Sequence, residues 1–181
     1  MVPSASAAGH VEQPAPAAAQ PPPSAEELYR AAEAALAARD LVTADLKLAQ
    51  ILQEHPRSPL IDQSLYERAR IAYQQRAWPA ARNHLARLAT IPATPFAEQG
   101  NYLRCRVALD AHEASAAACL AGFRAAFRSS PHDLDALALL IQLAHARAGC
   151  AGAASLVEEL AEAYPRTTLA AAWRARCPEP P

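Results

Sequence analysis

The sequence repeats itself, and this repetition constrains the fold more than any other feature. The segment 28–52 aligns on the segment 65–89 without a gap. A third unit runs from Tyr102 to Pro131 and a fourth from about Asp133 to Pro165. Because proline disfavours a helical residue before it, a proline at the end of each unit marks a helix end, and such regular spacing is typical of two-helix repeats. The closing prolines are Pro56, Pro92, Pro131 and Pro165.

The composition agrees with a helical repeat. The chain has 5 glycines and is rich in alanine, which favours helix, whereas β-branched residues are scarce. Ser24 and Glu27 have the spacing of a capping box and predict where the first helix begins. We therefore expect an all-α solenoid of four helical hairpins and a short C-terminal capping helix. The expected units are 24–58, 60–94, 97–131 and 133–166, with turns near Arg39–Asp40, Arg76–Ala77, Asp110–Glu113 and Gly149–Gly152, and the cap is 167–177.

The segment 1–23 differs from the rest. It contains six of the 16 prolines and no periodic apolar pattern, so we expect a disordered, Ala/Pro-rich tether before a repeat domain at 24–177. The segment lacks the basic start and apolar centre of a signal peptide. Tethers of this kind often follow a membrane anchor or join two modules; a disordered end without a function is the alternative.

Charge and motifs exclude several classes of function. A net charge of −1 gives no reason to expect nucleic acid or an anionic membrane as a partner. No apolar stretch is expected to reach the roughly 18 residues of a membrane-spanning helix. The phosphate-binding, nucleophile-elbow and zinc-protease motifs are missing from the sequence, so we expect no enzyme and no cofactor. The six histidines are scattered and no CxxC occurs, so we expect no metal site.

The four cysteines allow two disulfides. Cys105 and Cys119 are equidistant from a turn near His112, so they should lie level across an antiparallel hairpin, within reach of a disulfide. Cys150 and Cys177 could join the last hairpin to the capping helix. The alternative for the first pair is two reduced cysteines that pack as small apolar residues.

The first two units carry a pattern that resembles the tetratricopeptide repeat, in which small residues let two helices approach closely. The matching residues are Leu28, Ala32, Ala44, Leu48, Ile51 and Pro56 in the first unit, and Leu65, Ala69, Ala81, Leu85, Leu88 and Pro92 in the second. Together with the turn HPRSP, residues 24–170 are similar to bacterial envelope types, the BamD-like outer-membrane-assembly lipoproteins and the Tol-Pal coordinators.

This resemblance implies that the first helix of each hairpin lines a concave surface. Three rows of side chains recur there at the repeat period: one of tyrosines, one of mostly charged residues a turn later, and a mixed row after that, which includes Tyr73. An extended or helical ligand could bind such rows. The alternative is that the tyrosines seal one hairpin against the next. The candidate partner-binding residues are Tyr29, Glu33, Tyr66, Arg70, Tyr73, Tyr102 and Arg106.

We therefore expect a non-catalytic scaffold that binds a protein or peptide on its concave face. The alternative is an assembly subunit that docks through repeat edges and the terminal cap, which an exposed apolar face around Leu169 and Trp173 would favour. The family resemblance and the possible disulfides favour the periplasm or cell envelope, and the cytoplasm is the alternative.

Overall fold

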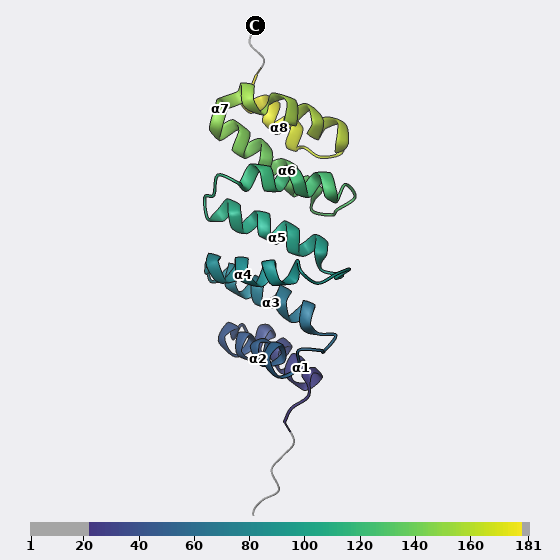
Figure 1. Cartoon of the computed structure of the whole chain (residues 1–181). Helices are drawn as coiled ribbons and strands as arrows, with labels where there is room; N and C mark the ends of the chain where they lie inside the picture. Colours follow the sequence, from purple (N-terminus) through teal and green to yellow (C-terminus); the bar gives the residue numbers. More distant parts are fainter. Residues whose placement is uncertain (1–21, 179–181) are drawn as a thin grey trace, which may run out of the picture.

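The protein is described here by a computed structural model that covers residues 22–178, and these residues form helices and short turns only (Figure 1). This confirms the predicted all-α class. The predicted tether lies outside the described residues, apart from Pro22 and Pro23. The helices are α1 (Ala25–Ala37), α2 (Leu41–Glu54), α3 (Ile61–Gln74), α4 (Trp78–Leu88), α5 (Ala97–Asp110), α6 (Ala116–Ala126), α7 (Asp133–Ala163) and α8 (Leu169–Arg176).

The capping box at Ser24 begins α1 as predicted. The Glu27 N–H donates to Ser24 Oγ at 3.2 Å, and the Ser24 N–H donates to Glu27 Oε2 at 2.7 Å. Two unpaired N–H groups at the start of the helix thereby gain acceptors, and the Glu27 carboxylate lies at the positive end of the helix dipole.

The turns of the first three hairpins share one backbone conformation. Arg39, Arg76 and His112 follow the first helices with left-handed φ angles of 59°, 56° and 56°. In each turn the next N–H donates at 2.8 Å to a carbonyl five residues earlier, as from Asp40 to Ala35. This pattern is a Schellman motif, which ends a helix and reverses the chain.

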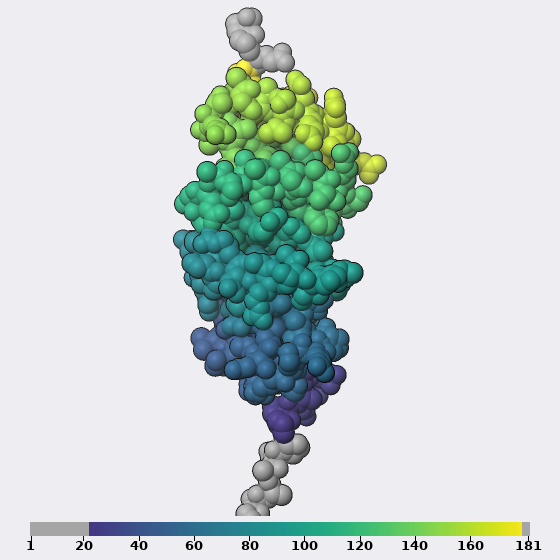
Figure 2. All heavy atoms as spheres, viewed as in Figure 1, coloured from purple at the N-terminus to yellow at the C-terminus, as the bar shows by residue number. Residues whose placement is uncertain are grey.

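The hairpins stack into one elongated body in which chain order follows the long axis (Figures 1 and 2). Alanines occupy the predicted close-approach positions of the paired helices, and Ala32, Ala44, Ala69 and Ala81 are all 0 % exposed. Bulkier side chains such as Leu28, Leu48 and Leu65 fill the space between helices. The small-and-bulky pattern of the first two units therefore forms the core.

The element α7 is a helix interrupted in the middle, and its two halves form the fourth hairpin. By length and composition alone this segment could cross a membrane, since one 18-residue window has a mean hydropathy of 1.3, so the expectation that no apolar stretch reaches this length is wrong for the sequence. The helix is interrupted at Ala148 and Gly149, where the backbone is not helical. The Tyr164 hydroxyl donates to Asp133 Oδ2 at 2.6 Å, so the two ends of α7 meet and its halves run antiparallel. The turn falls at the first of the two predicted glycines, because Gly149 has φ +62°.

Candidate interaction surface

The first helices α1, α3 and α5 carry the predicted partner-binding residues. Tyr29 on α1 is half-buried, and its hydroxyl accepts a hydrogen bond at 2.6 Å from Gln63 Nε2 on α3. Burial, with the nearby Glu67 and Glu33 carboxylates, raises the pKa of Tyr29. Glu33 is exposed one turn further along α1. Tyr29 therefore links two neighbouring units and presents only part of its ring to solvent.

Tyr66 and Arg70 form the centre of this surface. The Tyr66 ring stacks on Phe96, with 5.2 Å between ring centroids and 23° between planes. The Arg70 guanidinium lies 6.0 Å from the centroid of Tyr66, within the range of a cation–π contact. Its Nη1 also donates to Glu67 Oε2 at 2.9 Å, while the Arg70 side chain stays 47 % exposed. Burial raises the pKa of Tyr66.

Tyr73, two turns further along α3, makes a similar contact with Arg106 of α5. Arg106 lies 5.9 Å from the ring centroid of Tyr73, and its Nη2 donates to the Tyr73 hydroxyl at 3.0 Å. The Tyr73 hydroxyl donates in turn to the carboxylate of Asp110, which also lies 3.8 Å from Arg106. Burial and the bond to Asp110 raise the pKa of Tyr73. This network ties α3 to α5.

Tyr102 does not belong to this surface, and its prediction as a partner-binding residue is wrong. It is only 9 % exposed. Its ring is sandwiched in the core, stacked on His132 at 4.3 Å with 4° between planes and tilted against Phe123 at 5.4 Å. The alternative, a tyrosine that seals one hairpin against the next, describes Tyr102 correctly.

We call the remaining six residues the tyrosine–arginine surface: Tyr29, Glu33, Tyr66, Arg70, Tyr73 and Arg106. It offers partly exposed ring faces and guanidinium N–H donors, groups suited to recognising another protein. Both arginines already have a carboxylate neighbour within the chain, Glu67 for Arg70 and Asp110 for Arg106. A ligand would therefore meet oriented ion pairs rather than two isolated positive charges.

Sequence reasoning missed the residues that support the tyrosines, namely Gln63, Phe96 and Asp110. For Asp110 a signal exists, because its separation from Tyr73 equals the repeat offset of the first two units. Phe96 lies between two units, outside the aligned segments, and the repeat gives no sign of it.

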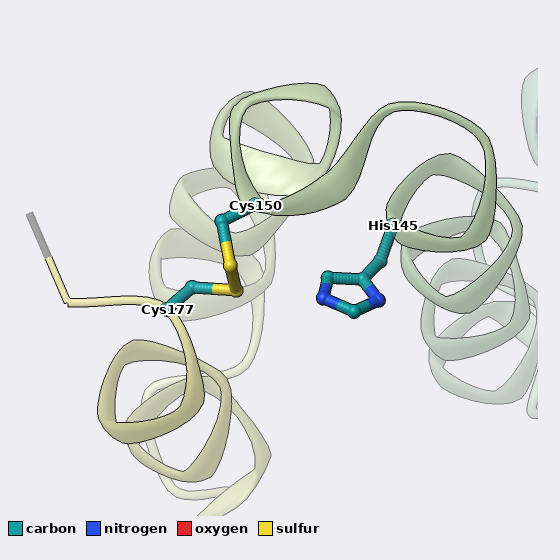
Figure 3. A group of neighbouring side chains, drawn as sticks. All are labelled: His145, Cys150 and Cys177. Carbon is teal, nitrogen blue, oxygen red and sulfur yellow. A yellow bond between two sulfur atoms is a disulfide. The ribbon is translucent and has the colours of Figure 1, made fainter.

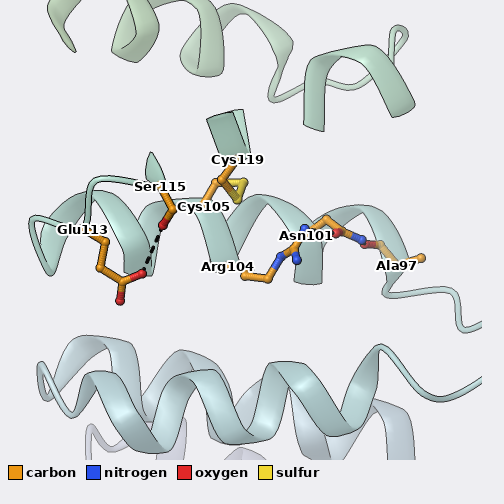
Figure 4. Close-up of a disulfide and its surroundings, with 7 residues drawn as sticks. All are labelled: Ala97, Asn101, Arg104, Cys105, Glu113, Ser115 and Cys119. Atoms are coloured by element: carbon orange, nitrogen blue, oxygen red, sulfur yellow. Dashed lines mark hydrogen bonds between the residues drawn. A yellow bond between two sulfur atoms is a disulfide. The ribbon is translucent and has the colours of Figure 1, made fainter. Parts of the chain in front are cut away.

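The cysteines form two disulfides in the structure. Cys105 on α5 joins Cys119 on α6, with 5.3 Å between Cα atoms, and Cys105 is fully buried (Figure 4). Cys150 joins Cys177 with the same Cα separation and ties the fourth hairpin to the end of α8 (Figure 3). Among the described residues, the one cluster of possible metal ligands is His145, Cys150 and Cys177.

Stacked two-helix hairpins that pack through small residues define the tetratricopeptide-like class of interaction solenoids. The family model of the YfiO outer membrane lipoproteins matches residues 21–177, so the chain belongs to this family. The resemblance to BamD-like proteins is thereby confirmed. Membership supports a protein-interaction role in outer membrane assembly, in the cell envelope. No individual curated protein matches the chain.

Proposed function

We propose that the protein is a non-catalytic scaffold that binds a segment of a partner protein on the tyrosine–arginine surface, within a cell-envelope complex. Family membership supports the envelope and the interaction role. The observation that carries the choice of surface is a pair of tyrosine–arginine contacts, Arg70 over Tyr66 within α3 and Arg106 of α5 over Tyr73 of α3.

The physical basis is a stiff apolar area flanked by directional donors. Tyrosine loses little conformational entropy when it is covered, and aromatic and arginine side chains dominate binding energies at interfaces. The Arg70 guanidinium uses one of its nitrogens on Glu67 and has further N–H groups for a carboxylate of the partner. A partner segment with apolar side chains and an acidic group or a C-terminal carboxylate suits this surface.

The experiment begins with a photo-crosslinking amino acid in the full-length protein at position 33, and in parallel at position 87 as a control. Glu33 is an exposed residue of the tyrosine–arginine surface, so Tyr66 and Arg70 stay in place. Arg87 is an exposed arginine of α4, outside the tyrosine–arginine surface. A partner captured from envelope extract at 33 and not at 87 identifies the ligand of this surface.

Affinities for that partner are then compared among wild type, Tyr66→Ala, Arg70→Ala and Arg87→Ala. The first two should weaken binding by about 1–2 kcal/mol. Arg87→Ala should leave it unchanged. If Tyr66→Ala lowers the melting temperature markedly and leaves affinity unchanged, the tyrosines are packing residues and the proposal fails.

A second candidate function is assembly through the C-terminal end, and one observation favours it. Leu169 at the start of α8 is 38 % exposed, and a groove of about 460 Å³ beside α8 is lined by Val157, Ala153 and Trp173. Trp173→Ala should then disrupt the complex while Tyr66→Ala leaves it intact, the reverse of the result expected for the tyrosine–arginine surface.

A further inference from the structure

Three side chains that are distant in sequence converge at the C-terminal end of the solenoid. His145 lies in the first half of α7, Cys150 directly follows the Gly149 turn, and Cys177 follows α8 (Figure 3). One ligand atom from each, a ring nitrogen and two sulfurs, lies within 4.8 Å of the other two. None of the three residues is buried, and Figure 3 shows the imidazole directed toward the sulfur pair.

We propose that this cluster is a redox-gated site for Cu(I): oxidised, it is the Cys150–Cys177 disulfide, and reduced, it binds the ion through both sulfurs and His145. This inference does not depend on the proposed scaffold function. The chemistry of the donors carries it, because two thiolates and an imidazole are ligands that soft ions such as Cu(I) and Zn(II) prefer.

The backbone already has the spacing that such a site needs. Two sulfurs bound to one ion lie about 4 Å apart when each metal–sulfur bond is about 2.3 Å. The Cα atoms of Cys150 and Cys177 are 5.3 Å apart, so rotation of the side chains can separate the sulfurs by this distance. The ring of His145 is held beside them by its contact with Trp173, at 5.4 Å between centroids.

Soft thiolate donors and the lack of a fourth protein ligand in the described part of the chain favour Cu(I) over a closed structural Zn(II) site. A structural zinc site has four protein ligands, whereas this cluster supplies three among the described residues. Three soft donors suffice for Cu(I), because this ion does not require tetrahedral coordination.

The gating step is a thiol–disulfide exchange. A dithiol reductant transfers two electrons and two protons to the Cys150–Cys177 disulfide, which becomes two thiols while the reductant becomes a disulfide. Cu(I) then binds the two sulfurs, and their protons pass to water. A disulfide oxidant reverses the step: it accepts two electrons from the two thiolates and becomes a dithiol, the sulfur–sulfur bond of Cys150 and Cys177 forms again, and Cu(I) is released because two of its three ligands are lost.

The other disulfide provides a matched control within the same chain. Cys105 is 0 % exposed, and the described residues offer the Cys105–Cys119 pair no third ligand in a comparable cluster. A variant Cys150→Ser/Cys177→Ser therefore keeps one reducible pair and lacks the proposed site. His145→Phe keeps an aromatic ring against Trp173 and removes only the ligand nitrogen.

The test uses the full-length protein, reduced with dithiothreitol, freed of reductant without oxygen, and titrated with Cu(I) against a chromophoric chelator. We expect reduced wild type to withdraw one equivalent, and oxidised wild type and Cys150→Ser/Cys177→Ser to withdraw none. His145→Phe should bind at least about tenfold more weakly. Equal uptake by the double variant, or no effect of His145→Phe, would overturn the proposal.

Circular dichroism of each sample covers the case in which reduction unfolds the last hairpin. There, Cu(I) should restore helicity in wild type and not in the double variant. Failure to restore it in wild type would also overturn the proposal.

Discussion

Four alanines set the distance between paired helices in the first two units. Ala32 and Ala44 belong to one hairpin, Ala69 and Ala81 belong to the next, and all four are fully buried. A methyl group is the largest side chain that such close contacts accept without moving a helix. The solenoid geometry thus depends on the small size of these side chains as much as on the bulky leucines beside them.

Ala44→Leu and Ala81→Leu should therefore each lower the free energy of unfolding by about 1–3 kcal/mol, through overpacking. Urea denaturation measures the loss. Ala80→Leu, at an exposed position on the same helix as Ala81, serves as the control and should change stability little. Equal stabilities of all three variants would show that the repeat register is wrong.

Asp133 is the most deeply buried charged residue that the structure describes, at 6 % exposed. Burial acts to raise its pKa, but hydrogen bonds from Arg124 and Tyr164 outweigh burial and hold the pKa below the usual 3.8. A lowered pKa in the folded state adds stability above the pKa of the unfolded state, and this stability disappears as pH falls through the folded value.

The free energy of unfolding should accordingly decrease below about pH 4, with Asp133 responsible for part of the slope. Asp133→Asn should have a shallower acid dependence than wild type, measured by urea denaturation from pH 6 to pH 3.

At alkaline pH the free energy of unfolding should depend on pH in the opposite sense and decrease as pH rises. The pKa of Tyr164 is raised from 10.0 to about 12, so its contribution declines above pH 10, and Tyr164→Phe should remove that decline. Identical acid profiles of unfolding free energy for wild type and Asp133→Asn would refute the role given to Asp133.

Among the helices, α7 shows most clearly how one turn residue can reverse the direction of the chain. Gly149 has φ 62° and ψ −157°, a region that almost only glycine enters. An added Cβ would meet no atom within 4 Å, so any penalty for a larger residue comes from the backbone alone.

Gly149→Ala should thus lower stability by about 1–3 kcal/mol. Gly122, in the middle of α6, is also free of neighbours within 4 Å but has ordinary helical angles. Gly122→Ala should raise stability by about 0.5–1 kcal/mol. The pair is measured by thermal and urea denaturation, and effects of the same sign would contradict the assigned turn.

The helices were predictable because local patterns specify them. The repeated small and bulky residues and the closing prolines indicate the paired helices, and the capping box marks the first helix start. The exposure of each tyrosine was not predictable, because it depends on loops between units. Tyr66 meets Phe96 and stays partly open, whereas Tyr102 meets His132 and Phe123 and is buried. Phe96 and His132 lie in connections to which the repeat pattern does not extend, and Phe123 lies in α6 of the third unit, where the pattern is weaker.

At the scale of the whole molecule, stability is close to a sum over units and their shared faces. Each hairpin packs on its neighbours, as expected for a solenoid. The tyrosine–arginine surface spans α1, α3 and α5, so its shape depends on how the first three units stack. The cluster at His145 instead depends on the contact between the last hairpin and the cap, which no short sequence motif encodes.

Both disulfides lie in the C-terminal half, so reduction should act there alone. In the chain-entropy account, constraining loops of 14 and 27 residues stabilises a protein by about 3 and about 3.5 kcal/mol. Reduced protein should melt at a lower temperature, and hydrogen exchange should accelerate in α5–α8 while α1–α4 keep their protection. Protein isolated from its native compartment without reductant should show no free thiols. Four titratable thiols would contradict the bridged state.

The uneven placement of the two bridges also gives the chain a mechanical polarity. When the ends are pulled apart, the hairpins before Cys105 can unravel completely, whereas the loops closed by the bridges cannot lengthen. At about 3.6 Å per extended residue, loops of 14 and 27 residues withhold roughly 150 Å of contour length. Tension applied through the N-terminus would unfold the first two hairpins, and with them most of the tyrosine–arginine surface, while the two loops closed by the bridges stayed short.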